Sequence, residues 1–570
     1  MSEWNLSLSR SSRPRTACLL FCMKSATRAC RTLFSSHRRR ERTKQSVMNV
    51  TLLLTLVFCW MSHAVNRPNI LLLFADDLGR YASAYSDPAQ PSPNDIIRTP
   101  VFDRMAREGV LFQHAFVAVP SCTPSRAALV TGRYFFRNGS HSQLHSPWQK
   151  NAAPDPFEKI KALPLILRDG GYHIGHSLKL HMRDSIIGGK GNLYNSAGQK
   201  INEYSEILTK TTDKEAAKKQ IFNEVKANFR NFLAKRQKDQ PFYYSFNPTN
   251  THRKWVQGSG KALWGLNPDD LKGKMPPVMP DVPEIREDLA DYLGEAMAFD
   301  AACGVLIEIL EQSGELDNTI VVISGDHGVP GFPRGKTNVH DLGSEVLLSI
   351  RWPKKIVSHR VVKVPVSLID LTPTFLDAVG LTSPDDPNGQ SLLPALIKGG
   401  DDRKLRGWAL IGRERHAGSA RAGELPYPVR ALRTPDFLYV KNFKPDRWPM
   451  GDPFQVTDSS EPNYESLTNH TYAAFPDMDM SPTKAWLVKH RKDAGMAPFI
   501  DFAWGKRPGE ELYDLSTDPH QTKNLASDPA YAATLKQLRE QLMSELKVNA
   551  DPRLADDAFD RSPYHAKEHR

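Results

Sequence analysis

The 570-residue chain has few cysteines outside its N-terminus, and this shortage excludes one class of fold. Six cysteines are present, and four of them lie within the first 60 residues. Only Cys122 and Cys303 remain downstream, so the chain cannot be a domain stabilised by a disulfide framework. Cys303 falls on the apolar face of a predicted helix at 285–312, which indicates a core thiol.

The chain also lacks a strong excess of positive charge once its N-terminus is set aside. Its formal net charge is +11, but residues 1–47 hold eleven Lys and Arg against Glu3 and Glu41, a net of +9. The other 523 residues therefore carry +2. A nucleic-acid partner is not expected, because this body has no basic patch pattern.

The N-terminus has no apolar run long enough to span a bilayer comfortably. The run from Val50 to Met61 is short, and Ser62-x-Ala64 after it is a small-residue cleavage pattern. We expect residues 1–64 to be a basic leader and signal peptide, with Met48 as the true start. The predicted location is outside the cytoplasm (periplasmic, secreted or lysosome-like), without a stable membrane anchor. An uncleaved N-terminal anchor is the alternative.

Two short apolar runs predict buried strands of a mostly parallel sheet. They cover residues 69–75 and 319–324, and each ends in acidic or imidazole side chains. Open α/β sheets bind ligands at the carboxyl ends of their strands, so these side chains are candidate ligands. They are Asp76, Asp77, Asp326 and His327.

The segment Cys122-Thr-Pro-Ser-Arg-Ala-Ala-Leu-Val-Thr-Gly132 predicts a helix that begins at the cysteine. Pro124 suits its first turn. Free N–H groups and the helix dipole at such an end favour an anion, and Arg126 can reach the same anion. The alternative is an ordinary capped helix with a chance cysteine.

This segment resembles the signature of the type I sulfatases, C-x-P-S-R-x-x-L-x-T-G, whose cysteine is oxidised to formylglycine. Every fixed position of the signature is met, and the resemblance extends from about Arg67 to about Leu546. Within the family the chain is most similar to the sulfamidases, which act on N-sulfoglucosamine at heparan-type ends. That narrower similarity rests on Gly335-Lys336-Thr337-Asn338 and on Pro241-Phe242 leading into His252-Arg253.

The resemblance implies an α/β fold with an alkaline-phosphatase-like large domain. We expect this catalytic domain at 66–404, with a mostly parallel mixed sheet flanked by helices. A smaller α+β domain is expected at 405–546, followed by a tail at 547–570.

The resemblance also implies one Ca²⁺ per site and a partner enzyme, a formylglycine-generating enzyme or an anaerobic maturase. Three carboxylates suit a hard divalent cation, and an imidazole is a less typical ligand for one. The implied metal ligands are Asp76, Asp77, Asp326, His327 and the modified Cys122. The implied catalytic residues are Cys122, Arg126, Lys179, His181, His252 and Lys336.

One catalytic segment departs from the family pattern. Lys179 and His181 follow Leu178, where the family has glycine, so a different local backbone is expected. His173 and His176 compete for the role of His181. In the implied mechanism, cations neutralise the sulfate and the hydrated formylglycine attacks sulfur. A histidine, His252, then protonates the leaving group, while His181 accepts a proton when sulfate is eliminated.

Several arginines near residues 412–433 are candidates for binding a carboxylate or a second sulfate of an acidic sugar. The predicted substrate-binding residues are Arg413, Arg415, His416 and Arg430. A solvated charged face is the alternative. Two other functions also stay open: a phosphonate monoester or phosphodiester hydrolase on the same fold, and a non-catalytic protein that binds sulfated glycans.

Overall fold

The computed structural model describes residues 67–139, 159–182, 184–188, 194–195, 198–384, 386–555 and 557–560. Residues Arg67–Arg570 form one compact unit. The predicted leader, signal peptide and Met48 start lie outside the described residues, as do residues 561–570 of the predicted tail. In the described ranges, no helix is both long and apolar enough to cross a membrane.

An eight-stranded sheet forms the centre of the catalytic part, in the order β10-β2-β9-β7-β1-β6-β4-β5. All its strands run parallel except β9, which is antiparallel to both neighbours. The strands are β1 (Asn69–Ala75), β2 (Val110–Phe112), β4 (His173–Leu178), β5 (Tyr194–Asn195), β6 (Phe242–Asn247), β7 (Thr319–Gly325), β9 (Leu348–Arg351) and β10 (Arg360–Val362). A small second sheet contains β3 (Ala115–Phe116), β8 (Glu345–Val346) and β11 (Val366–Ser367).

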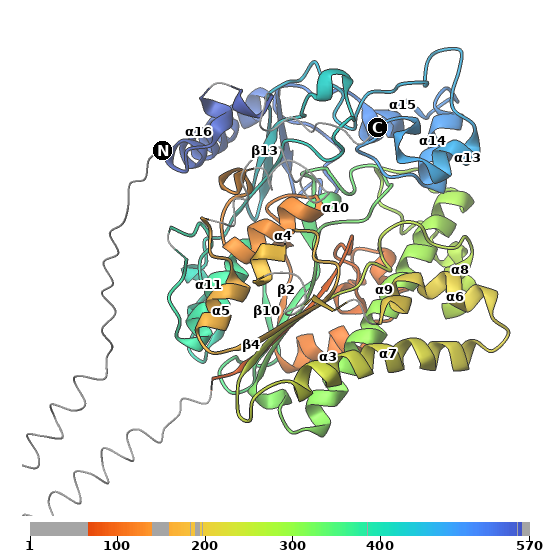
Figure 1. Cartoon of the computed structure of the whole chain (residues 1–570). Helices are drawn as coiled ribbons and strands as arrows, with labels where there is room; N and C mark the ends of the chain where they lie inside the picture. Colours follow the sequence, from red (N-terminus) through yellow and green to blue (C-terminus); the bar gives the residue numbers. More distant parts are fainter. Residues whose placement is uncertain are drawn as a thin grey trace, which may run out of the picture. The chain divides into compact units, whose positions relative to one another are not determined.

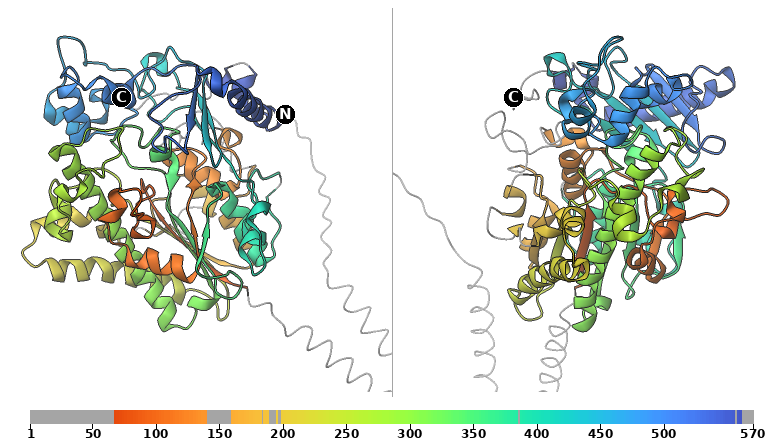
Figure 2. Two further views of the ribbon diagram at one scale, coloured as in Figure 1. Left: turned by 180° about the vertical axis from the view of Figure 1, so that it is seen from behind. Right: turned by 90° about the vertical axis from the view of Figure 1, so that its right-hand side faces the viewer.

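Helices cover both faces of the central sheet (Figures 1 and 2). One face packs against α3 (Pro100–Glu108), α6 (Tyr204–Lys210), α7 (Lys214–Ala234), α8 (Ser259–Trp264) and α9 (Pro283–Gln312). The other packs against α4 (Cys122–Thr131), α5 (Leu163–Asp169) and α11 (Leu371–Val379). Cys303 is buried in the core on α9, as predicted. Two further short helices are α10 (Asp341–Ser344) and α12 (Leu393–Leu396).

Strands β1 and β7 lie side by side at the middle of the sheet, and their sequences explain why. Both are buried along their whole length, so they are apolar on both faces rather than alternating. Their register pairs Ala75 with Gly325, which brings the residues that follow each strand to the same edge. A Cβ at Gly325 would lie 1.9 Å from the Leu78 carbonyl oxygen, so glycine is required for this close approach.

The C-terminal part is built on a four-stranded antiparallel sheet, β12-β13-β14-β15. Its backbone is tied to the segment that precedes α4, because the Gly412 N–H donates to the Ala118 carbonyl at 3.0 Å. The predicted α/β fold with a smaller α+β part is confirmed. Its strands and helices are β12 (Ala409–Arg413), β13 (Val429–Arg433), β14 (Phe437–Asn442), β15 (Glu510–Asp514), α13 (Tyr464–Asn469), α14 (Pro482–His490), α15 (Ala497–Trp504) and α16 (Ala532–Val548).

A buried ion-pair network joins this sheet to the chain beyond α16. Arg430 is fully buried and donates to Asp551 at 2.6 Å and to Glu414 at 2.7 Å. Arg553 also pairs with Glu414, and the Arg430 guanidinium lies 4.7 Å from the ring centroid of Phe135. Asp551 and Arg553, beyond the predicted boundary at residue 546, are therefore joined to this sheet by ion pairs.

Removing one partner of this network leaves a buried charge unpaired. We therefore expect Arg430→Met to lower the free energy of unfolding strongly. Breaking a buried ion pair costs about 3–5 kcal/mol. Urea unfolding followed by fluorescence measures the loss. Arg403→Met is the matched control, because the Arg403 side chain is 91% exposed beside Asp401; its midpoint should stay near that of the wild type. Equal midpoints for the two variants would contradict a structural role for Arg430.

Candidate active site

Three buried aspartates meet where β1 and β7 end. Asp76 and Asp77 follow β1, Asp326 follows β7, and none of the three is exposed to solvent. The Asp77 N–H donates to Asp326 Oδ1 at 2.8 Å, which locks the two strand ends together. Three adjacent carboxylates without solvent require cationic partners, because burying an unpaired charge is costly.

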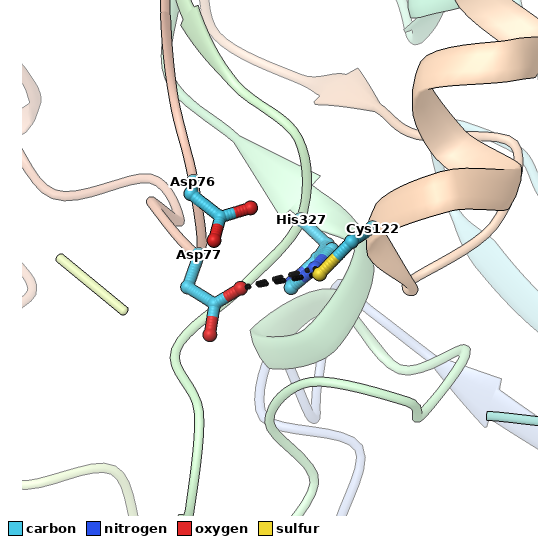
Figure 3. Close-up of side chains that lie close together, drawn as sticks. All are labelled: Asp76, Asp77, Cys122 and His327. Atoms are coloured by element: carbon cyan, nitrogen blue, oxygen red, sulfur yellow. Dashed lines mark hydrogen bonds and ion pairs between the residues drawn. The ribbon is translucent and has the colours of Figure 1, made fainter. Parts of the chain in front are cut away.

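Cys122 and His327 face the Asp77 carboxylate (Figure 3). The Cys122 Sγ lies 3.7 Å from Asp77 Oδ1 and 3.3 Å from His327 Nε2, and that nitrogen is 3.2 Å from the same carboxylate oxygen. Helix α4 begins at Cys122, as predicted, and ends at Gly132 in a left-handed conformation. Cys122 is thus at a helix N-terminus, where the dipole favours anions.

Arg126, one turn further along α4, connects both strand ends. Its Nε donates to Asp326 at 2.8 Å and one terminal nitrogen donates to Asp76 at 3.2 Å. The other terminal nitrogen donates to Asn247 at the end of β6. Since the side chain is buried and fully engaged with these groups, Arg126 holds the carboxylates in place.

Lys179 approaches from the end of β4 on the side of Asp76. Its Nζ lies 2.5 Å from Asp76 Oδ2. The preceding residue, Leu178, has φ = 65°, in the left-handed region that favours glycine. Leucine therefore adopts the conformation for which the family's glycine is suited, and the expected departure of the backbone does not keep Lys179 out of the site.

Lys336 approaches from the loop after β7 on the side of Asp77. Its Nζ lies 2.9 Å from Asp77 Oδ2 and 3.1 Å from Asp479 Oδ2. The lysine side chain is 2% exposed. Asp479 belongs to the C-terminal part, so the active site is completed by a segment more than a hundred residues downstream of Lys336.

His252 lies at the open side of the site. Its Nε2 is 3.9 Å from Asp77 Oδ2, and the side chain is 33% exposed. The other ring nitrogen is 2.6 Å from the Arg253 carbonyl, which fixes the ring with Nε2 toward the carboxylates. The neighbouring Thr251 hydroxyl donates to the Asp76 carbonyl and anchors this loop to β1.

The three histidines around β4 differ in position. The His181 carbonyl accepts a hydrogen bond from Thr123 at 2.8 Å, next to Cys122. His173 stands at the opposite end of β4 and stacks on Phe232. His176 is buried beside Asn247, and burial lowers its pKa to about 3. His181 is the one brought to the start of α4.

Burial and charge together set the protonation of the site. Burial works to raise the pKa of Asp76, but Lys179 and Arg126 outweigh it and hold this pKa well below its ordinary value. Burial raises the pKa of the Cys122 thiol well above its ordinary value, and Asp76 raises it further. Burial works to lower the pKa of Lys336, but two neighbouring carboxylates outweigh it and raise this pKa. The unmodified cysteine is consequently a protonated thiol and a poor nucleophile.

The donor atoms fit a divalent cation. One oxygen or nitrogen atom from each of Asp76, Asp77 and His327, with the Cys122 sulfur, lies within 4.8 Å of the others. Asp326 adjoins them, with Oδ1 3.5 Å from His327 Nε2. Buried carboxylate oxygens are the ligands that a hard cation such as Ca²⁺ prefers. All five predicted ligands are therefore brought together.

The structure does not bring the predicted arginines to this cluster. The Arg430 guanidinium donates hydrogen bonds to Glu414 and Asp551 inside the C-terminal part. Arg413 and Arg415 are also buried, and they donate to the carbonyls of Pro449 and Phe559. These arginines thus bind groups inside the C-terminal part and do not line a pocket that is open to a sugar.

The fourth predicted substrate-binding residue, His416, lies closer to the reactive position. Its Nδ1 is 2.9 Å from the Ser121 hydroxyl, directly before Cys122. Both side chains are buried, so His416 supports the start of α4 from the C-terminal part.

Sequence reasoning missed two residues of the site, Asn247 and Asp479. Asn247 had a signal, because this polar residue stands at the carboxyl end of a buried strand, as Asp76 stands directly after β1. Asp479 had none, because it lies in a loop without a recognisable pattern.

Comparisons with known proteins identify the family of the chain. A sequence model of the family described as "Sulfatase" matches residues 68–381. Human N-sulphoglucosamine sulphohydrolase is 30% identical over 518 residues, covering 85% of this chain and 91% of the human protein. An ulvan-active sulfatase of Formosa agariphila is 26% identical over 516 residues, covering 84% and 74% of the two chains.

Solved structures show the same fold. A protein in complex with its substrate D-glucosamine-2-N,6-O-disulfate aligns with a TM-score of 0.56 at 19% identity, over 88% of this chain and all of that chain. The phosphonate monoester hydrolase of Agrobacterium radiobacter aligns with a TM-score of 0.54 at 18% identity, over 85% and 96% of the two chains. The match to the family model and the human relative shows that the chain belongs to the sulfatase family, enzymes that hydrolyse sulfate esters or sulfamates.

Proposed function

We propose that the protein is an exported sulfatase that removes sulfate from a sulfated glycan, with an N-sulfoglucosamine group of a heparan-type chain as the favoured substrate. The observation that carries this proposal is the position of Cys122, at a helix N-terminus among three carboxylates and His327. The substrate class is supported by the human relative, an N-sulphoglucosamine sulphohydrolase that this chain matches over most of its length.

Two groups complete the proposed enzyme. A formylglycine-generating enzyme or an anaerobic maturase converts Cys122, and the hydrated aldehyde then supplies a hydroxyl nucleophile. Asp76, Asp77, Asp326, His327 and residue 122 would hold calcium, which would supply positive charge to neutralise the sulfate group. The signal peptide proposed at residues 1–64 would carry the chain to a compartment where extracellular glycans are degraded.

The cationic side chains have separate tasks in this proposal. Lys179 and Lys336 lie next to different carboxylates of the cluster, Asp76 and Asp77 respectively. Each ammonium group has three donors, so each can bind a sulfuryl oxygen while it keeps its aspartate partner. Arg126 stabilises the carboxylate framework.

His252 and His181 would move the protons. His252 Nε2 faces the cluster from the partly exposed side, where the leaving sugar must depart, and it can protonate that leaving group. His181, whose backbone carbonyl lies beside the start of α4, would accept a proton from residue 122 when sulfate is released.

Mass spectrometry of the tryptic peptide at residues 108–126 tests the conversion of Cys122. We expect the aldehyde form in protein purified from the native host, and Cys122→Ala to abolish sulfate release. Protein from a host without the converting activity is the control and should carry the thiol. A native preparation that contains only the thiol but cleaves sulfate would overturn this nucleophile.

Paired assays distinguish the alternative functions. N-Sulfoglucosamine, an O-sulfated glucosamine and a phosphonate monoester are each supplied to the converted enzyme. The proposal expects the highest kcat/KM with N-sulfoglucosamine. Preference for the phosphonate would favour the phosphonate hydrolase, and tight glycan binding without turnover would favour the non-catalytic protein.

Replacement of the proposed acid, His252→Gln, should affect substrates according to their leaving group. A general acid contributes about 100- to 10,000-fold, so kcat on N-sulfoglucosamine should fall by a factor in that range. 4-Nitrophenyl sulfate needs little protonation of its leaving group and should lose much less. His490→Gln, on a surface histidine bonded to Asp493, is the control and should leave both rates unchanged. Equal losses on both substrates would rule out the acid role.

Calcium should stabilise the folded protein through the carboxylate cluster. At about 100 times its Kd, a ligand that binds only the native state adds about 2.7 kcal/mol of stability. Thermal unfolding with and without calcium measures this gain, which Asp77→Asn should lose. Asp458→Asn, at an exposed position of the C-terminal part, should keep it. A gain that survives in Asp77→Asn would place the calcium elsewhere.

A further inference from the structure

Residues 475–483, here named the C-terminal clasp, run alongside the loop that carries Lys336. The Thr337 hydroxyl donates to the Asp477 carbonyl at 3.0 Å, and the Ser481 hydroxyl donates to the Gly331 carbonyl at 2.8 Å. These two bonds flank Lys336 in the sequence. The clasp therefore fixes the lysine loop from a distant part of the chain.

The clasp is itself held by buried charged groups. Lys484 is buried and donates to the carbonyls of Met478 at 2.8 Å and Phe475 at 3.3 Å. The Asp477 carboxylate accepts hydrogen bonds from the Ala417 N–H at 2.9 Å and from Arg421 at 2.6 Å. Buried charged groups that are satisfied in this way rigidify the segment that contains them.

The same segment also reaches the loop that carries His252. Thr483 Oγ1 donates to Asp288 at 2.6 Å, and Asp288 accepts two hydrogen bonds from Arg253, at 2.6 and 2.9 Å. Arg253 directly follows His252 in the sequence. The clasp thus connects the two loops whose side chains, Lys336 and His252, lie nearest to Asp77 Oδ2.

One clasp side chain enters the active site directly. Asp479 Oδ2 lies 3.1 Å from Lys336 Nζ, while Asp77 Oδ2 lies 2.9 Å from the same nitrogen. Two carboxylates in contact with one ammonium group define its position better than either does alone. Lys336 Nζ donates a hydrogen bond to Asp77 and forms an ion pair with Asp479, so N–H donors of the ammonium group remain available for substrate.

We propose that Asp479 is a positioning residue that aims the ammonium group of Lys336 at a sulfuryl oxygen of the substrate. The inference rests on the proposed function, in which Lys336 binds that oxygen. Without Asp479, the buried ammonium group has Asp77 as its remaining carboxylate partner and is drawn toward it. Lys336 then binds the substrate less effectively, although every proposed metal ligand is intact.

A double-mutant cycle tests this role. The variants are Asp479→Ala, Lys336→Ala and the double variant, with kcat/KM measured on the sulfated substrate. We expect Asp479→Ala to lose about 10- to 100-fold, as is typical for residues that orient a catalytic group. In the Lys336→Ala background it should cause no further loss, because its partner is absent. Asp479→Asn, which keeps an acceptor oxygen, should recover part of the loss.

Asp458→Ala is the matched control, since this aspartate is exposed in the same part of the chain. It should leave kcat/KM at the wild-type value. If Asp479→Ala causes the same loss with and without Lys336, Asp479 acts independently and the proposal is overturned. No loss in either background also overturns it. Thermal unfolding checks that each variant folds, and Asp479→Asn replaces Asp479→Ala in the cycle if the latter does not.

A wild-type enzyme inactive on every sulfated substrate would refute the proposed function rather than this role. The affinity of the wild type and of the same three variants for inorganic sulfate is then measured by calorimetric titration. Asp479→Ala should weaken sulfate binding when Lys336 is present and have no effect when it is absent. A loss of sulfate affinity that is independent of Lys336 would contradict the proposal.

Discussion

The burial of three neighbouring carboxylates is the constraint on which the rest of the active site depends. Asp76, Asp77 and Asp326 are excluded from solvent, and charges in such a position are tolerated only when they are paired. The structure supplies Arg126 from α4 and two lysines from separate loops. Each cation comes from a different element, so the carboxylates are paired only when α4, the end of β4 and the loop after β7 are all in place.

This arrangement explains why the helix start and the strand ends lie at one point. Arg126 binds both strand ends and belongs to the first turns of α4, so its ion pairs set the distance between Cys122 and the carboxylates. The C-terminal part adds support through His416 on Ser121 and through Asp479 on Lys336. The C-terminal part therefore contributes to the site through residues that lie outside its four strands.

Much of this could be predicted from the sequence because the signals are local. Fully apolar runs that end in aspartate predict parallel strands with ligands at their carboxyl ends, and Asp76 and Asp326 follow that rule. The signature around Cys122 predicted the start of α4 at the correct residue. Other features depend on pairing between segments that are distant in the sequence. The sequence does not reveal that Arg430 forms an ion pair with Asp551, or that Asp479 forms one with Lys336.

A crystal structure of the calcium-soaked Cys122→Ser variant with N-sulfoglucosamine tests the central claim most directly. The account predicts the cation bound by Asp76, Asp77, Asp326 and His327, with the sulfuryl group between the ammonium groups of Lys179 and Lys336. Anomalous scattering identifies both the cation and the sulfur. A sulfuryl group bound away from these lysines, or a cation away from the carboxylates, would contradict it.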